Sequence, residues 1–113
     1  MGRSQRSDAE VSDMNEVVIL AGGGADLQRL FEVYEDRQEG LGLEFHSACE
    51  EAFGLLSKFP YMAPVYQLPY RRFLLRRWIV GVFYAFDGKR VIVHAALDLR
   101  EDPNDVRRRL GFE

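Results

Sequence analysis

The chain has 113 residues, of which 47% are hydrophobic and 29% are charged, and its formal net charge is −3. This composition is that of an ordinary globular protein rather than of a disordered or membrane protein. A chain of this length buries about two-thirds of its surface on folding, which is enough for one hydrophobic core but not for two domains.

Residues 1–13 show no apolar periodicity, and we expect them to form a flexible arm or to be a remnant of cloning that precedes one domain at 14–113. No basic leader followed by an apolar segment marks the chain for secretion. The longest uncharged apolar run, Trp78 to Phe86, has nine residues, about half of what a bilayer crossing needs. We therefore expect a cytoplasmic protein that does not contact a membrane.

The first half of the chain predicts one strand and two helices. Asn15–Ala21 is a short β-branched run typical of a buried strand, and Gly22–Gly24 predict a flexible turn after it. The glycine run lacks the further glycine or lysine that a nucleotide-binding loop requires. Apolar residues then recur with a helical period over 25–37 and again over Phe45–Leu56, before Pro60 ends the pattern. This pattern predicts an antiparallel helical hairpin.

The second half predicts a sheet. The proline-rich segment Pro60–Pro69 predicts an irregular loop. Runs rich in Val, Ile, Phe and Leu then predict three strands, over Tyr70–Trp78, Ile79–Phe86 and Arg90–Leu97. Asp87-Gly88 predicts a hairpin turn, and Asn104–Leu110 a short helix with Asp102 as its cap and Pro103 at its first position. The order βααβββ(α) predicts an α+β fold, with the helical hairpin packed on a small, mainly antiparallel sheet.

The two halves carry opposite charge. Residues 1–56 have 4 basic and 12 acidic side chains, a net −8, whereas residues 57–113 have 11 basic and 6 acidic side chains, a net +5. This asymmetry indicates that the second half meets an anionic surface. That surface is a nucleic acid, an acidic peptide or the acidic half of the chain itself.

Arginines are the candidate binding residues for this anionic surface. Four of them bracket the apolar residues 73–75 of one predicted strand, and alternation sends Arg71 and Arg77 to one face and Arg72 and Arg76 to the other. The full candidate set is Arg71, Arg72, Arg76, Arg77, Arg100, Arg107 and Arg109. Guanidinium groups hold carboxylates or phosphates bidentately. The alternative is that they pair with Glu35, Glu50 or Glu51 on the helices.

The other reactive residue types point to no chemistry. His46 and His94 have no acidic or cysteine partner at metal-ligand spacing, so we expect them to be structural or exposed. Cys49 is the only cysteine; it excludes an internal disulfide and falls on the apolar stripe of the second helix, as a small core residue does. We expect no metal site and no cofactor.

Seven short motifs occur in an order and spacing shared with a known family. They are Val18-Ile19-Leu20, Ala25-Asp26-Leu27, Tyr34-Glu35, the Phe45-to-Pro60 helix ending in Lys58-Phe59-Pro60, Arg71-Arg72-Phe73-Leu74-Leu75, Val82-Phe83-Tyr84 and the tail 98–103. Over about residues 14–111, the chain resembles the toxins of type II toxin–antitoxin systems in the ParE/RelE superfamily, in particular the ParE-like plasmid stabilization branch.

The resemblance implies a growth-inhibiting toxin that is neutralised by direct binding of a cognate antitoxin, typically of the ribbon–helix–helix type with an acidic segment. The implied target is DNA gyrase in ParE-like members and mRNA on the ribosome in RelE-like members. A RelE-type, metal-independent endoribonuclease would use Arg76, Arg77 and Arg100 as catalytic residues. The RelE-type tyrosine near the C-terminus is missing, because the last tyrosine is Tyr84.

Two further departures concern the tail: Arg100 is followed by Glu101 where relatives have a second basic residue, and Val106 stands where an aromatic residue is common. We therefore expect a non-enzymatic inhibitor, with DNA gyrase as its target. The alternatives are a ribosome-dependent mRNA endoribonuclease and a relative of the same fold that has lost toxicity.

Overall fold

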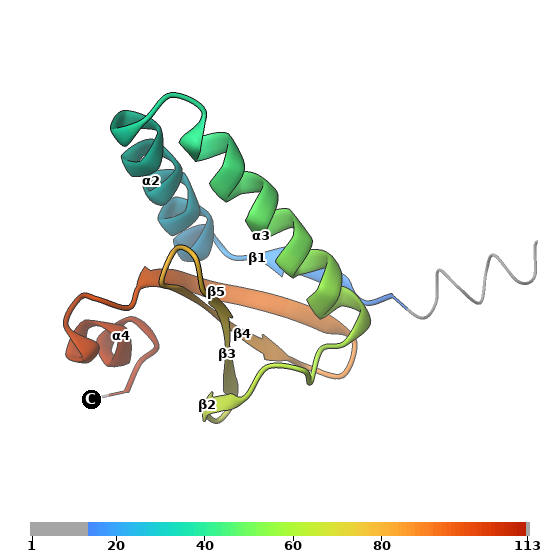
Figure 1. Ribbon diagram of the computed structural model, residues 1–113. Coiled ribbons are helices and arrows are strands. Elements are labelled where there is room, and N and C mark those ends of the chain that lie inside the picture. Colours follow the sequence, from blue (N-terminus) through green and yellow to red (C-terminus); the bar gives the residue numbers. More distant parts are fainter. Residues whose placement is uncertain (1–13, 113) are drawn as a thin grey trace, which may run out of the picture.

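In the computed structural model, a helical hairpin and a short C-terminal helix cover opposite faces of one sheet (Figure 1). The structure describes residues 14–112, and the expectation for residues 1–13 lies outside them. The elements are, in chain order, β1 (Glu16–Ile19), α2 (Ala21–Arg37), α3 (Leu41–Lys58), β2 (Val65–Gln67), β3 (Tyr70–Leu75), β4 (Val80–Phe86), β5 (Arg90–Asp98) and α4 (Pro103–Arg109).

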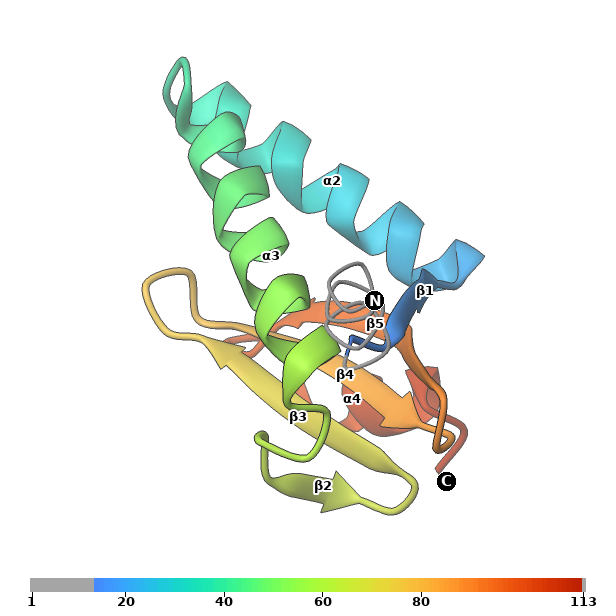
Figure 2. The ribbon, with the colours of Figure 1, turned by 90° about the vertical axis from the view of Figure 1, so that its right-hand side faces the viewer.

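The sheet has five strands in the order β1-β5-β4-β3-β2. Only β1 pairs in parallel, with β5, and the other neighbours are antiparallel. Figure 2 shows α2 and α3 side by side above the sheet, with α4 behind the strands. The predicted α+β fold, with a helical hairpin on a mainly antiparallel sheet, is confirmed.

The prediction of a turn at Gly22–Gly24 is wrong, because these residues form the first turn of α2. Gly24 donates its backbone N–H to Leu20 O at 2.8 Å, as a helical residue does. A Cβ on Gly23 would lie only 3.0 Å from Val93 O of β5. Glycine is therefore required because the start of the helix packs directly on the sheet.

The Pro60–Pro69 segment also differs from its prediction as an irregular loop, since it contains β2. This strand is short: only Val65 and Gln67 pair with β3, opposite Arg71 and Tyr70. Pro60, Pro64 and Pro69 lie outside this strand. Their missing backbone N–H groups therefore cost the sheet no hydrogen bond.

The predicted strand Tyr70–Trp78 ends early, at Leu75, and residues 76–79 form the turn into β4. The predicted alternation therefore holds over residues 71–75 but is wrong for Arg76, Arg77 and Trp78. The C-terminal helix is confirmed as predicted: Asp102 caps it by accepting a hydrogen bond from Asn104 N–H at 2.9 Å, and Pro103 is its first residue.

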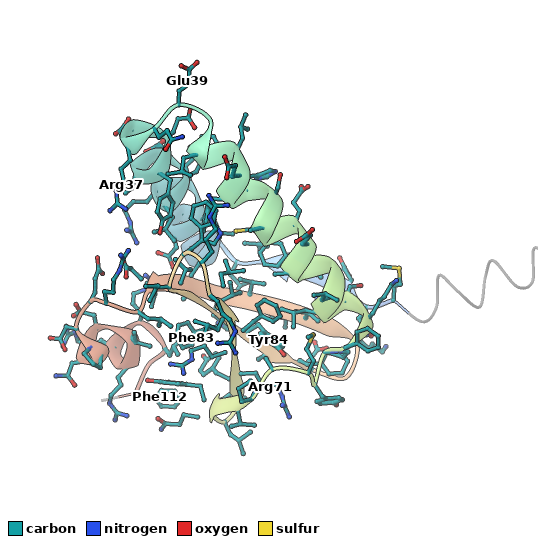
Figure 3. All side chains as sticks on the ribbon, in the orientation of Figure 1. Arg37, Glu39, Arg71, Phe83, Tyr84 and Phe112 are labelled. Carbon is teal, nitrogen blue, oxygen red and sulfur yellow. The ribbon has the colours of Figure 1, made fainter. Side chains whose placement is uncertain are left out.

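Side chains of the central strand β4 alternate between two cores. Tyr84 lies on the side of the hairpin, where its hydroxyl donates to Pro60 O at 2.7 Å, and Phe83 lies on the side of α4 (Figure 3). The core under the hairpin is the larger and includes Leu30, Tyr34, Phe45, Cys49, Leu56, Trp78, Val82 and Val93. The core under α4 consists of Phe83, Ala95, Leu97, Val106 and Leu110.

Ile79 ends the β3–β4 turn in the left-handed region, at a φ of 54°. A β-branched side chain is strained there, and glycine is not. We expect the free energy of unfolding of Ile79→Gly to be about 1 kcal/mol higher than that of Ile79→Ala. Both variants lose the apolar contacts of the isoleucine side chain, but only the alanine variant keeps a Cβ. Urea denaturation of both variants measures this difference. An alanine variant at least as stable as the glycine variant would contradict it.

Candidate binding site

A groove of about 610 Å³ lies between α3 and β3. Its lining residues are Glu44, Ser47, Ala48, Glu51, Ala52 and Leu55 from α3, and Phe73, Leu74, Leu75, Arg76, Arg77 and Trp78 from β3 and the turn after it. Apolar side chains line most of its length, both arginines lie at the end formed by the turn, and Glu51 lies about two helical turns along α3 from Glu44. A groove of this kind accepts a chain segment that is apolar along its body and charged at one end.

One wall of this groove is an open strand edge. Arg72 donates its backbone N–H to Pro64 O at 3.1 Å, away from β4. Because backbone groups alternate in direction along a strand, the N–H and C=O of Leu74 point to the same edge, beyond the end of β2. The Leu74 side chain is 36% exposed. An extended peptide can therefore pair with β3 at this position.

The turn at the end of the groove is anchored by Trp78. The Tyr34 hydroxyl donates to Trp78 O at 3.2 Å, and the indole packs edge-on against the rings of Tyr34 and Phe45, with centroids 4.8 and 5.3 Å away. Trp78 is thus buried between the two helices, on the hairpin side of the sheet. This packing fixes the position of the two arginines that precede it.

Arg76 and Arg77 are both exposed on this turn. The Arg77 guanidinium lies 4.6 Å from the centroid of the Trp78 ring and forms an ion pair with Glu44 of α3, with 2.8 Å between nitrogen and oxygen. Among residues 14–112, no carboxylate lies within ion-pair distance of Arg76. The sequence analysis left open that these arginines pair with glutamates of the helices. Arg77 does so, but its partner is Glu44 rather than Glu35, Glu50 or Glu51.

Arg100 lies at the same end of the sheet, because Leu99 N–H donates to Ile79 O of the turn at 2.9 Å. Its guanidinium is hydrogen-bonded to the Asp98 carboxylate at 3.0 Å, which lowers the pKa of that carboxyl group. Arg37 adds its charge near Asp98 from the end of α2 (Figure 3). The structure therefore groups Arg76, Arg77 and Arg100 from the predicted set, and it adds Arg37.

Arg71 and Arg72 lie elsewhere and support the fold. Arg71 donates to the carbonyl oxygens of Tyr61 and Ala63, at 3.2 and 2.7 Å, and so holds the segment before β2. Arg72 lies on the other face, with its guanidinium 5.9 Å from the Tyr66 ring centroid. The predicted opposite orientation of these two arginines is confirmed.

The two arginines of α4 attach this helix to the rest of the molecule. Arg107 donates to the Gln67 side chain of β2 at 3.3 Å. Arg109 makes a bidentate pair with Asp26 of α2, at 2.9 and 2.8 Å, and this pairing raises the pKa of Arg109. Asp26 is only 5% exposed and also accepts the backbone N–H of Ala96 at 3.0 Å.

Sequence reasoning did not identify Asp26 as a buried ion-pair residue. A signal was present, because Asp26 falls four residues before Leu30 and eight before Tyr34, on the face of α2 that is buried. An acidic residue in that phase indicates a buried partner.

The histidines and the cysteine have structural positions. Cys49 is buried in the core under the hairpin, as predicted, and burial raises the pKa of its thiol to about 12. His94 packs edge-on against Tyr70, and partial burial lowers its pKa. His46 is exposed and lies 3.3 Å from a Glu50 carboxylate oxygen.

Within residues 14–112, no three His, Cys, Asp or Glu side chains cluster as metal ligands do. No helix of this part is both long and apolar enough to span a bilayer.

Comparison with known proteins identifies the fold. No protein-family model matches the sequence, and no curated protein matches it significantly. Among solved structures, the chain is similar to one from the chromosomal ParDE toxin–antitoxin system of P. aeruginosa, with a TM-score of 0.65 and 18% identity. The match covers 78% of this chain and 99% of that chain. The two chains therefore share a fold, which is the α+β architecture that the sequence analysis predicted.

The buried Asp26–Arg109 pair is expected to contribute more to stability than a surface pair. Asp26→Ala leaves Arg109 and the Ala96 N–H without their acceptor, and we expect it to lower the free energy of unfolding by about 3 kcal/mol. Asp105→Ala is the matched control, since it removes the exposed partner of Arg108, and it should have little effect. Urea denaturation measures both. Equal losses in the free energy of unfolding of the two variants would show that the Asp26 pair stabilises the fold no more than an exposed ion pair does.

Proposed function

We propose that this protein is the toxin of a type II toxin–antitoxin module, of the ParE-like plasmid stabilization branch, and that an antitoxin neutralises it by direct binding. The fold similarity to a chain of a ParDE system supports this class. The observation that carries the proposal is the groove between α3 and β3, which combines an open strand edge with the exposed arginine pair of the turn.

The antitoxin segment that fits this groove is extended, apolar in its body and acidic at one end. Its backbone pairs with β3 at Leu74, its apolar side chains occupy the groove, and its carboxylates bind Arg76 and Arg77. Arg100 supplies a third cation at the same end. Charge-assisted hydrogen bonds to guanidinium groups are among the stronger polar interactions at interfaces.

The proposed target is DNA gyrase, which the toxin inhibits in the cytoplasm by binding rather than by catalysis. Expression of the chain from a tightly regulated promoter tests this directly. We expect growth arrest with gyrase-linked DNA breaks, and rescue by co-expression of a cognate antitoxin. Codon-positioned mRNA cuts would instead identify the endoribonuclease alternative. Normal growth with the folded protein present would identify a relative without toxicity.

Charge reversal at the turn is expected to weaken the toxin–antitoxin complex. Arg76→Glu/Arg77→Glu replaces two attractions by two repulsions and should raise the dissociation constant at least about 30-fold, measured by calorimetry. Lys89→Glu/Arg90→Glu is the matched control, because it reverses two exposed basic residues of the β4–β5 hairpin, and it should change the constant less than about threefold.

Glu44→Gln is expected to have the opposite effect. The carboxylate of Glu44 competes with the antitoxin for Arg77, so its removal should tighten the complex about threefold. Unchanged affinity in both the arginine double variant and Glu44→Gln would place the antitoxin away from this turn, whatever the growth assay shows.

A further inference from the structure

A second groove runs along the outside of the helical hairpin, between α2 and α3, and the proposed function does not use it. It is a cavity of about 270 Å³. Its lining residues are Ile19, Gly24, Leu27, Gln28, Phe31, Phe45, His46, Cys49, Glu50 and Phe53. It lies on the opposite side of α3 from the antitoxin groove, because the two cavities share no residue of that helix.

The body of this outer groove is apolar and incompletely covered. Leu27, Phe31 and Phe53 are only half-buried, and Ile19 at its β1 end is 42% exposed. The sheet packs against the other side of the hairpin, as both ribbon views show (Figure 1, Figure 2). Aromatic and aliphatic side chains arranged in a line between two helices are typical of a surface that receives another helix.

The rim of the outer groove is acidic. On α2, Gln28 donates to Glu32 at 2.9 Å, and on α3, Glu50 lies beside His46. Among residues 14–112, no lysine or arginine lines the cavity. Arg29 of α2 does not line the cavity; its guanidinium lies 3.5 Å from the buried Asp26 carboxylate, and its side chain is 52% exposed. A carboxylate therefore flanks the apolar residues on each helix: Glu32, which accepts a hydrogen bond from Gln28, and Glu50, which lies beside His46.

We infer that this outer groove binds a basic amphipathic helix of a partner protein. The apolar side of that helix fits between α2 and α3 as the ridges of one helix fit the groove of a pair. Its lysines or arginines lie over Glu32 and Glu50. The antitoxin segment is acidic and is repelled by this rim, so the two grooves select partners of opposite charge. The inference does not depend on the proposed function, and both partners can bind at once.

The groove contains a position at which it can be filled without disturbing the fold. A Cβ on Gly24 meets only the Ile19 side chain, at an ordinary 3.8 Å. Gly24→Leu therefore places its side chain in the groove, where the partner's apolar residues would lie. Gly54 of α3 lies outside the groove and has no atom within 4 Å of an added Cβ. Gly54→Leu is thus the same substitution on the same hairpin without the obstruction.

The test titrates the full-length protein with a synthetic amphipathic helix that has leucines at helical spacing on one side and lysines beside them. A second peptide has the same leucines and glutamates in place of lysines. We expect saturable binding of the lysine peptide in the micromolar range and at least about tenfold weaker binding of the glutamate peptide. Gly24→Leu should raise the dissociation constant of the lysine peptide at least about tenfold, whereas Gly54→Leu should change it less than about twofold.

Glu32→Lys/Glu50→Lys should invert the preference, so that the glutamate peptide binds more tightly than the lysine peptide. Thermal melts of every variant establish that it is folded before titration. The inference is overturned if the lysine peptide does not bind saturably. It is also overturned if Gly24→Leu and Gly54→Leu bind the lysine peptide equally well. A preference between the two peptides that Glu32→Lys/Glu50→Lys leaves unchanged would overturn it too.

Discussion

The buried carboxylate of Asp26 joins parts of the chain that are far apart in sequence. It accepts the Ala96 N–H of β5 and both guanidinium nitrogens of Arg109, and it projects from the helix that covers the sheet. β1 pairs with β5 only as far as Val93, so the Ala96 amide lies beyond the last β1 residue and would be left without an acceptor. One side chain therefore completes the strand edge, orients α2 and fixes α4 on the opposite face.

This arrangement divides the seven candidate arginines of the second half into two groups. Arg71, Arg72, Arg107 and Arg109 contact carbonyl groups, rings, an amide or a buried carboxylate of the chain itself. Arg76, Arg77 and Arg100 lie at the end of the sheet where the groove between α3 and β3 opens. The basic half of the chain therefore supplies internal partners for the fold, and we propose that its remaining arginines bind an external anion.

Local sequence patterns were sufficient to predict the element order except for β2, together with the hairpin and the capped C-terminal helix, because periodicity and capping are properties of short segments. They failed where tertiary contacts decide. Gly23 is helical because the helix start packs on Val93, and Trp78 reaches the hairpin core because the strand ends at Leu75. A register shift in β5 between Val93 and Ala95 likewise depends on pairing with β4. The helical phase of Asp26 indicates a buried partner, but that partner, Arg109, lies 83 positions away, so no local pattern could identify it.

The central claim is that a partner occupies the groove between α3 and β3 and adds to the open edge of the sheet. Amide hydrogen exchange of the chain alone and in complex with its antitoxin measures this most directly. Pairing at the edge predicts that the Leu74 amide becomes strongly protected in the complex, together with the turn at residues 76–79. Unchanged exchange at Leu74 and the turn, with new protection confined to the outer surface of the hairpin, would contradict the account.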